Sequence, residues 1–332
     1  MSDGKSADGA GKLAVVFGGS GFIGRNVVRE LGKRGWRVRA AVRRPHHAQF
    51  LRPMGAVGQI QLFQANVRHR PSVARALEGA DAVVNLVGLL FQQGAQSFSR
   101  VQAAGAALIA DCAKAAGVDT FIHMSAIGAD PESDSLYART KGEAERAVRA
   151  SVPSATILRP SVVFGPEDQF FNKFASMASL VPPFLPLPIL IGGGVTKFQP
   201  VYVDDVADAV AAALVKPEAR GKTYELGGPR VYTFRQLLEF MLAETGLKRM
   251  LLPAPFAVAP ALGLAGEVIG ALPFLTPPIT RDQVTLLKRD NIVAADALTL
   301  ADLGLTPETL EAIVPRYLAR FRKYGQFAER AA

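Results

Sequence analysis

Cysteine and histidine are scarce in this chain of 332 residues, and long unbroken apolar runs are missing. The single cysteine, Cys112, excludes an internal disulfide framework and suits a reducing compartment. The four histidines and this cysteine do not have the spacing of metal ligands, so we expect no metal site. Because every apolar run of about 18 residues is interrupted, we also expect no transmembrane helix.

Acidic residues are outnumbered by basic ones, and the formal net charge at pH 7 is +9. This excess favours anionic partners such as lipid head groups, acidic protein subunits or a phosphorylated cofactor. A basic helix with interleaved aromatic residues is missing, so we expect no nucleic-acid partner. A generally basic, solvated surface explains the charge equally well. Residues 1–12 are rich in glycine, serine and aspartate, and we expect a flexible tail rather than a secretory signal.

A glycine-rich motif near the start of the chain is its most informative feature. The apolar run Leu13–Phe17 has the pattern of a buried parallel strand, and glycines follow it at positions 18, 21 and 24. Gly18 allows a tight turn, Gly21 allows a pyrophosphate to approach the backbone, and Gly24 allows the next helix to pack closely. The start of that helix then faces an anion. The motif predicts a dinucleotide site that includes Gly18, Ser20, Gly21, Phe22, Ile23 and Gly24.

Strand-like and helix-like segments alternate along the first half of the chain. This alternation predicts an α/β fold, a Rossmann-type doubly wound parallel sheet. The expected strands are Leu13–Phe17, Arg37–Val42, Ile60–Asn66, Ala82–Val87, Thr120–Ser125 and Ala155–Phe164. The expected helices between them are Phe22–Arg34, Pro71–Leu77, Phe98–Ala116 and Tyr137–Ala150.

The pattern changes in the second half, where proline-rich and helix-like segments predominate. A helix over Val201–Val215, capped by Asp204 or Asp205, and a strand over Thr223–Leu226 are expected to rejoin the sheet. The expected domains are the tail 1–12, a dinucleotide-binding Rossmann domain 13–165, and a smaller, mostly helical lobe 166–332 whose residues 201–228 return to the Rossmann core.

Tyr137 and Lys141 form a Tyr-x-x-x-Lys motif at the start of a predicted helix. The spacing of four residues places both side chains on one helical face. A neighbouring ammonium favours the phenolate form of a tyrosine, so Tyr137 is a candidate for proton exchange with a carbonyl or hydroxyl group. Lys141 is a candidate ligand of a nicotinamide ribose, and Ser125 of a substrate oxygen. Taken alone, the motif is typical of an exposed helix face; with the glycine motif and Ser125, it predicts a catalytic set.

These motifs together resemble the short-chain dehydrogenase/reductase superfamily in its extended or atypical branch. Further matches are the segments Asn85–Gly88, Leu158–Pro166 and Pro200–Ala207, and the resemblance covers Leu13 to Arg322. One departure is Gln102, three residues before Gly105, where many extended members carry asparagine. The resemblance implies that the nicotinamide pocket and the adjoining cofactor contacts include Leu86, Val87, Gly88, Pro160, Ser161, Val162 and Val163.

Two arginines stand at the end of the second predicted strand, where an NAD enzyme has an acidic residue for the adenosine ribose. Arg43 and Arg44 are suited to bind a 2′-phosphate, so we expect the cofactor to be NADP(H). The alternative is that both are solvated surface arginines. Asn66 lies where the resemblance places an aspartate beside the adenine, and we expect it to contact that ring.

A narrower resemblance is to the NADPH-binding accessory subunit of respiratory complex I. The segments that carry it are Phe164–Met177, Lys197–Val203 and Ile279–Val284. It implies a tightly held structural or regulatory NADPH and partner subunits near the quinone site of the complex. It also implies a peripheral position at the cytoplasmic face of a bacterial inner membrane, with the mitochondrial matrix side as the alternative.

The segment Leu251–Pro278 carries a single charge, Glu267, and four internal prolines break it into short pieces. It fits an apolar face against anionic lipid or a partner, and equally a lid over an apolar substrate pocket. Two other functions stay open: a free NADP(H)-dependent reductase or epimerase with a Tyr-Lys-Ser site, and a sensor that binds NADP(H) without chemistry.

Overall fold

The computed structural model describes residues 8–180, 189–270, 277–323 and 325–327. Expectations for residues 1–7 of the tail, and for 181–188, 271–276, 324 and 328–332 of the C-terminal lobe, lie outside the described residues. The chain divides into two compact units, each described here by itself. The sheet unit consists of Met1–Pro160, Val203–Leu226 and Ala295–Thr306, and the second unit of Ser161–Tyr202, Gly227–Ala294 and Pro307–Ala332.

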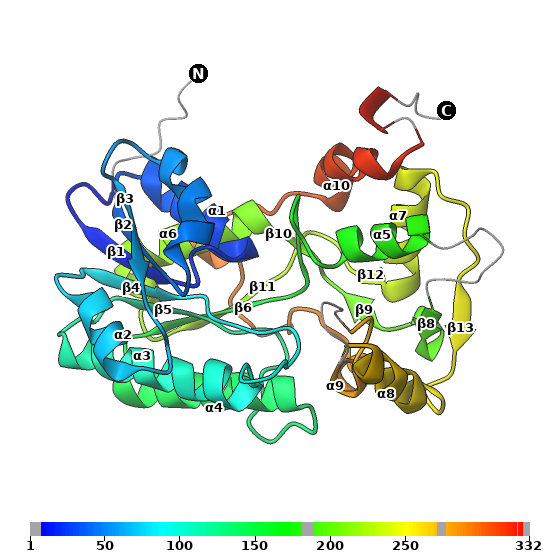
Figure 1. The fold of residues 1–332 in the computed structure, drawn as a ribbon, viewed down its shortest axis with the longest axis horizontal. Coiled ribbons are helices and arrows are strands. Elements are labelled where there is room, and N and C mark those ends of the chain that lie inside the picture. Colours follow the sequence, from blue (N-terminus) through cyan, green and yellow to red (C-terminus); the bar gives the residue numbers. More distant parts are fainter. Residues whose placement is uncertain (1–7, 181–188, 271–276, 324, 328–332) are drawn as a thin grey trace. The chain divides into compact units, whose positions relative to one another are not determined.

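The sheet unit is built on a seven-stranded parallel sheet with the strand order β11-β6-β5-β4-β1-β2-β3 (Figure 1). Its strands are β1 Leu13–Phe17, β2 Arg37–Val42, β3 Ile60–Gln64, β4 Ala82–Asn85, β5 Phe121–Met124, β6 Thr156–Pro160 and β11 Thr223–Leu226. The central strands β1, β4 and β5 are buried along their whole length, as strands of a parallel sheet covered on both faces are. The strand order reverses between β1 and β4, which is where ligands bind in doubly wound folds. The predicted fold class is confirmed.

Helices cover both faces of this sheet (Figure 1). The helices of the sheet unit are α1 Phe22–Lys33 and α6 Val203–Val215 on one face, and α2 Arg70–Leu77, α3 Ala104–Ala115 and α4 Leu136–Ser151 on the other. Two ion pairs, Arg29–Asp204 and Arg34–Asp208, join α6 to α1. Beneath α2, α3 and α4 lies a core of small and β-branched side chains, which lets the helices approach the sheet closely.

Several predicted elements differ in detail from the structure. The strand expected over Ala155–Phe164 ends at Pro160, because proline has no N–H to continue the ladder. The helix expected over Phe98–Ala116 opens as a π-helical segment, Phe98–Ala103. The prediction that Asp204 or Asp205 caps the helix is wrong, since α6 begins at Val203 and both acids lie in its first turn. There their negative charges interact favourably with the positive end of the helix dipole.

Part of the expected tail is packed rather than free. The backbone N–H of Gly9 donates to the carbonyl oxygen of Arg34 over 3.2 Å. Gly9 also lies so close to Trp36 that an added Cβ would stand 2.2 Å from the indole ring. The chain leaves the sheet unit after Pro160 and rejoins it at Val203, whereas the expected domain limits were residues 165 and 201.

The second unit has a core of helices and aromatic side chains. Its helices are α5 Phe171–Leu180, α7 Phe234–Thr245, α8 Ala259–Gly270, α9 Arg281–Leu286 and α10 Leu310–Leu318. Its strands form three pairs: β7 Val163–Phe164 with β10 Val201–Tyr202, β9 Lys197–Phe198 with β12 Tyr232–Thr233, and β8 Ile189–Ile191 with β13 Leu252–Ala254. The 3-10 segments among the described residues of both units are Pro45–Met54, Gly192–Gly194, Pro217–Ala219, Ala301–Leu303, Ala319–Phe321 and Gly325–Phe327.

Asp168 organises the start of α5 in this unit. Its carboxylate accepts hydrogen bonds from the backbone N–H groups of Gly165, Phe170 and Asn172. It also accepts the hydroxyl of Tyr317 on α10 over 2.6 Å. Burial raises the pKa of the Asp168 carboxyl, and these hydrogen bonds oppose that rise. The carboxylate thus caps one helix and ties a second helix to it. Within the described residues, none of the helices has the length and apolarity needed to cross a membrane.

Candidate cofactor site

The glycine-rich loop lies at the carboxyl ends of the central strands, between β1 and α1. Gly18 adopts φ +81°, a left-handed conformation that glycine enters without strain. A Cβ at Gly24 would stand 2.1 Å from the carbonyl oxygen of Gly18, so only glycine lets α1 start this close to the loop. The backbone N–H of Gly18 donates to Ala41 O on β2, and that of Leu86 donates to Phe17 O. These bonds bring the ends of β1, β2 and β4 together.

The N-terminus of α1 is open toward this loop. Gly21 is its N-cap residue, with extended backbone angles and no side-chain cap, and the first turn carries no acidic residue. The first N–H groups of a helix need a partner, and together with the helix dipole they favour an anion. Ser20, Phe22 and Ile23 are half-buried around this position, and Gly21 is exposed. The loop therefore has the shape and polarity that a dinucleotide pyrophosphate requires.

Arg43 and Arg44 lie directly after β2 and are exposed. Neither guanidinium has an ion-pair or hydrogen-bond partner among the described residues. Asn66 is exposed after β3, and its side-chain oxygen accepts the backbone N–H of Arg68 over 3.1 Å. These three residues stand after neighbouring strands of the sheet, because β2 pairs with both β1 and β3. The two arginines are thus available to an anionic group near the glycine loop.

The segment Leu86–Gly88, after β4, lies against the glycine loop. A Cβ at Gly18 would stand 3.2 Å from the carbonyl carbon of Leu86 and 3.3 Å from Val87 N. Gln102 supports this segment, because its side-chain oxygen accepts the N–H of Leu89 over 3.1 Å. The amide nitrogen of Gln102 donates to the hydroxyl of Thr140 on α4 over 3.1 Å. The glutamine that departs from the usual asparagine therefore links the loop after β4 to the helix that carries Tyr137 and Lys141.

Lys141 is buried beside the end of β5, where its ammonium donates to Met124 O over 2.9 Å. Burial lowers the pKa of this ammonium to about 8, and the nearby carboxylate of Glu145 opposes the fall. A Cβ at Gly88 would stand 3.5 Å from Lys141 Nζ. The structure thus brings Lys141 to the same strand ends as the glycine loop. Its ammonium releases a proton more readily than that of an exposed lysine, because burial disfavours the charged form.

Ser125 and Tyr137 both precede this lysine in the sequence, and their surroundings differ. The Ser125 hydroxyl is buried and has no hydrogen-bond partner in the described part of the chain. A buried hydroxyl without a partner is costly, so it is suited to a ligand group. Tyr137 is half-buried, and its ring meets that of Phe98 edge to face with centroids 5.7 Å apart. Ser135 caps α4 through the N–H of Ala138, which sets where the helix that carries Tyr137 begins.

An ion pair that sequence reasoning missed anchors α4 to the sheet. The guanidinium of Arg159 on β6 donates two hydrogen bonds to Glu145, over 2.9 and 2.6 Å, and lies 3.6 Å from Glu225 on β11. The hydrogen bonds from Arg159 to Glu145 raise the pKa of this guanidinium further. Glu145 stands one helical turn after Lys141, so this pair helps to fix the helix that presents the lysine. Residues so distant in sequence carry no local pattern that would have revealed the contact.

A second contact that the sequence analysis missed joins β4 to β5. The side-chain amide of Asn85 lies 3.2 Å from Nδ1 of His123, and its oxygen accepts the N–H of Val87. Burial lowers the pKa of His123 to about 3, and Lys141 adds to the fall, so the imidazole is neutral. The match of Asn85–Gly88 to a known motif pointed to this segment without showing that His123 supports it.

The residues after β6 are divided between the two units. Pro160 ends β6, and its carbonyl oxygen accepts the N–H of Ile127. Ser161, Val162 and Val163 belong to the second unit, where the Ser161 hydroxyl donates to Asn291. The structure therefore brings together the other predicted site residues at one edge of the sheet unit. The predicted roles of Ser161, Val162 and Val163 stay predictions.

The residues at this edge fit a nicotinamide dinucleotide. The glycines of the loop let a ligand lie directly against its backbone. The first turn of α1 has backbone N–H groups without a side-chain cap, and Ser125 has a buried hydroxyl without a partner in the described residues. A compact group of three or more possible metal ligands is not found among the described residues. The arrangement suits binding of an anionic dinucleotide.

Comparisons with known proteins agree with this geometry. A family model described as the NAD dependent epimerase/dehydratase family matches residues 14–227. The NADH dehydrogenase (ubiquinone) 1 alpha subcomplex subunit 9, mitochondrial, of Arabidopsis thaliana is 36% identical over 326 residues, 95% of this chain and 79% of its own length. The ceramide reductase of Caulobacter vibrioides is 31% identical over 273 residues, 82% of this chain and 81% of its own length.

Among solved structures, the NADPH-dependent quinone oxidoreductase QOR2 of Escherichia coli, complexed with NADPH, has a similar fold. The TM-score is 0.71 at 23% sequence identity, and the match covers 92% of this chain and 99% of that chain. At this identity the likeness shows the fold alone.

Proposed function

The chain belongs to the NAD dependent epimerase/dehydratase family, and we propose that it is an NADP(H)-binding accessory subunit of respiratory complex I. The observation that carries the proposal is the similarity to the Arabidopsis thaliana complex I subunit, which extends over 95% of the chain and so includes both units. The cofactor then has a structural or regulatory role. Its site lies in the sheet unit, and we propose that partner subunits near the quinone site contact the protein.

The preference for NADP(H) over NAD(H) rests on the end of β2. Arg43 and Arg44 are exposed and have no carboxylate partner among the described residues, so their charges are available to a 2′-phosphate. Guanidinium groups bind phosphate through paired, charge-assisted hydrogen bonds. No acidic residue stands at this position to bind the ribose hydroxyls of NAD(H) instead.

The other site residues bind and orient the dinucleotide. We propose that the α1 N-terminus holds the pyrophosphate, that Asn66 contacts the adenine, and that Lys141 binds the nicotinamide ribose. A bound nicotinamide supplies or accepts a hydride. In a subunit without turnover, Ser125 and Tyr137 act as hydrogen-bonding groups that keep the nicotinamide end in place.

The peripheral position at a membrane is supported by the exposed face of α8. The large apolar side chains of this helix and the segment before it are exposed by 44 to 63%: Val258, Leu264, Val268 and Ile269. The helix also packs on α9 and the segment before it, because Gly263 allows close approach to Arg281 and Gly266 to the backbone of Ile279. The one acid, Glu267, is paired with Arg281. A helix with this exposed face fits the boundary between head groups and acyl chains or an apolar partner subunit.

We place this surface at the cytoplasmic face of a bacterial inner membrane, with the matrix side of the mitochondrial inner membrane as the alternative. The sequence analysis placed the segment Leu251–Pro278 either against lipid or a partner, or over a substrate. The exposure of α8 favours the first of these interpretations, and residues 271–276 lie outside the described part.

A second candidate function is a free NADP(H)-dependent reductase that acts on an apolar substrate. Two observations favour it: the Ser125 hydroxyl is buried without a partner in the described residues, and the buried Lys141, of lowered pKa, donates to the carbonyl oxygen of Met124, the residue before Ser125. A lysine of lowered pKa is suited to proton transfer at neutral pH. The similarity to a ceramide reductase is consistent with it. In a reductase, Tyr137→Phe abolishes turnover with little loss of NADPH affinity; in a subunit, no turnover exists to lose.

Affinity purification of the tagged full chain from gently solubilised membranes of its own cells tests the complex I assignment. We expect the other subunits of the complex and NADPH to co-purify with the chain. Recovery of the chain alone, with cofactor that exchanges freely, would overturn the assignment and favour the reductase.

A further inference from the structure

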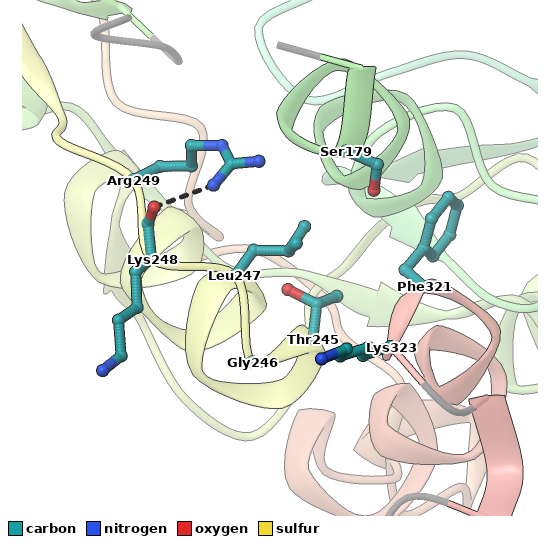
Figure 2. Close-up of a pocket in the computed structure, with 8 residues that line it drawn as sticks. All are labelled: Ser179, Thr245, Gly246, Leu247, Lys248, Arg249, Phe321 and Lys323. Carbon is teal, nitrogen blue, oxygen red and sulfur yellow. Dashed lines mark hydrogen bonds between the residues drawn. The ribbon is translucent and has the colours of Figure 1, made fainter. Parts of the chain in front are cut away.

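A pocket in the second unit lies where α7 ends, and none of the predicted cofactor residues lines it. Its volume is about 600 Å³, and a neighbouring pocket of about 520 Å³ shares the segment Gly246–Arg249 with it. Figure 2 shows the side chains that line it: Ser179, Thr245, Gly246, Leu247, Lys248, Arg249, Phe321 and Lys323. Three of these residues are basic and none is acidic, so the pocket carries positive charge.

Arg249 is held in place by neutral groups. Its Nε donates to Ala178 O over 2.8 Å, and Nη1 donates to the carbonyl oxygen of Lys248 over 2.9 Å (Figure 2). Because both acceptors are neutral backbone carbonyls, the guanidinium is held in one orientation and its positive charge is not compensated by a carboxylate. Lys248 is exposed and has no ion-pair partner within the described residues. Figure 2 shows the Lys248 side chain pointing away from the Arg249 guanidinium. The pocket thus has one pre-oriented cation and a second, flexible cation that must turn toward a phosphate bound at Arg249.

The carboxylate and the helix-end carbonyls that lie closest to the pocket in sequence already have partners. The carboxylate of Glu244 is paired with Arg322 over 3.1 Å. The last carbonyls of α7 accept the N–H groups of Gly246 and Leu247, which close the helix end around a left-handed glycine. These contacts weaken the repulsion that a helix C-terminus would otherwise exert on an anion.

Exposed apolar side chains stand next to the basic ones. Leu180 follows the lining residue Ser179 and is 82% exposed, and Met250 follows Arg249 and is 66% exposed. Leu252, two residues further on, is 42% exposed, and Phe321 contributes a half-buried ring to the lining. A small soluble phosphate compound needs no apolar rim. A phospholipid does, because its phosphate is attached to acyl chains.

We propose that this pocket binds the phosphate of an anionic phospholipid, with Lys248 and Arg249 as the ligands and Leu180 and Met250 in contact with the acyl region. The proposal rests on the peripheral membrane position in the proposed function and adds to it a specific headgroup site. The pocket is then a second contact with the membrane surface, in addition to the apolar contact proposed for α8.

Flotation of the purified full chain with vesicles tests this site. The vesicles contain phosphatidylcholine with or without phosphatidylglycerol, at physiological ionic strength. The double variant Lys248→Gln/Arg249→Gln is expected to lower the partition coefficient on phosphatidylglycerol vesicles about 30-fold. The matched control Arg75→Gln/Lys114→Gln removes two exposed charges from helices of the sheet unit and should change it less than about twofold, because neither residue lines the pocket. Lys248→Gln alone keeps the hydrogen bonds of Arg249, and circular dichroism checks the fold of each variant.

An equal loss in the test and control variants would show that only net charge matters, and it would overturn the site. Competition by soluble glycerol phosphate at constant ionic strength would show that free phosphate is the ligand, and it would overturn the assignment to lipid. Because the assay contains no other protein, its outcome is independent of complex I assembly. If the chain floats with the vesicles and does not co-purify with the complex, the lipid site stands and the proposed function is overturned. If it co-purifies with the complex and does not float, only the lipid site is overturned.

Discussion

Substitution of the buried Lys141 by methionine gives the sharpest physical test of the cofactor site. Burial lowers the pKa of the ammonium from 10.5 to about 8, so at pH 7 the folded protein carries the charge at a cost of about 3 kcal/mol. Methionine has a similar length and removes the charge. Loss of the hydrogen bond to Met124 O offsets about 1–2 kcal/mol of the gain. We therefore expect Lys141→Met to be at least as stable as the parent at pH 7, while its affinity for NADPH falls.

The pH dependence gives the sign of this effect. Below pH 8 both the folded and the unfolded chain hold the proton, and the cost is fully present. Between pH 8 and pH 10.5 the unfolded chain binds more protons at this group than the folded chain does, so the free energy of unfolding of the parent rises with pH. From pH 7 to pH 9.5 this group contributes a rise of about 2 kcal/mol, which the variant lacks.

Urea denaturation followed by tryptophan fluorescence measures this difference. Trp36 is the single tryptophan of the sequence and is 2% exposed in the sheet unit, so its signal reports the unit that contains Lys141. Lys114→Met, which removes an exposed lysine from α3, controls for the loss of one charge. If the stability difference between Lys141→Met and the parent is the same at pH 7 and pH 9.5, the lysine is not destabilised by burial and the reasoning fails.

Three further predictions follow from the same contacts. Arg43→Gln with Arg44→Gln should raise the Kd for NADPH at least about tenfold and leave that for NADH nearly unchanged in calorimetric titration, since only the 2′-phosphate contact is lost; equal losses for both nucleotides would contradict the NADP(H) preference. Gly24→Ala should abolish binding of either nucleotide, because the new methyl group would stand 2.1 Å from Gly18 O; near-normal affinity would show that the cradle is dispensable. Tyr317→Phe should destabilise the second unit by about 1.5–3 kcal/mol, read as faster amide exchange in α10, through loss of the bond to Asp168; unchanged exchange would mean that this bond does not hold α10.

The sheet and the glycine loop were predictable because their signals are local. An apolar run of five residues before spaced glycines defines β1 and the start of α1 almost to the residue. The Tyr-x-x-x-Lys spacing likewise locates α4, since a helix fixes which side chains share a face. These motifs depend on backbone geometry within a few residues, which sequence patterns record directly.

The remaining features depend on contacts between distant segments. Arg159 looked like part of a strand motif, and its pairing with Glu145 follows only from the packing of α4 on the sheet. The end of β6 at Pro160 could not be predicted, because apolar residues continue after it and form β7, which belongs to a different strand pair. The return of Ala295–Thr306 to the sheet unit had no local signal, and it rests on backbone bonds such as that from Glu225 N to Leu298 O.

The central claim is that this chain is an NADPH-holding subunit of complex I. The most direct test separates the complexes of gently solubilised native membranes and locates the chain, its NADPH and the NADH:quinone oxidoreductase activity in the same gel. The account predicts that all three migrate together, with one NADPH for each copy of the chain. Migration of the chain as a small species, away from that activity, would contradict it.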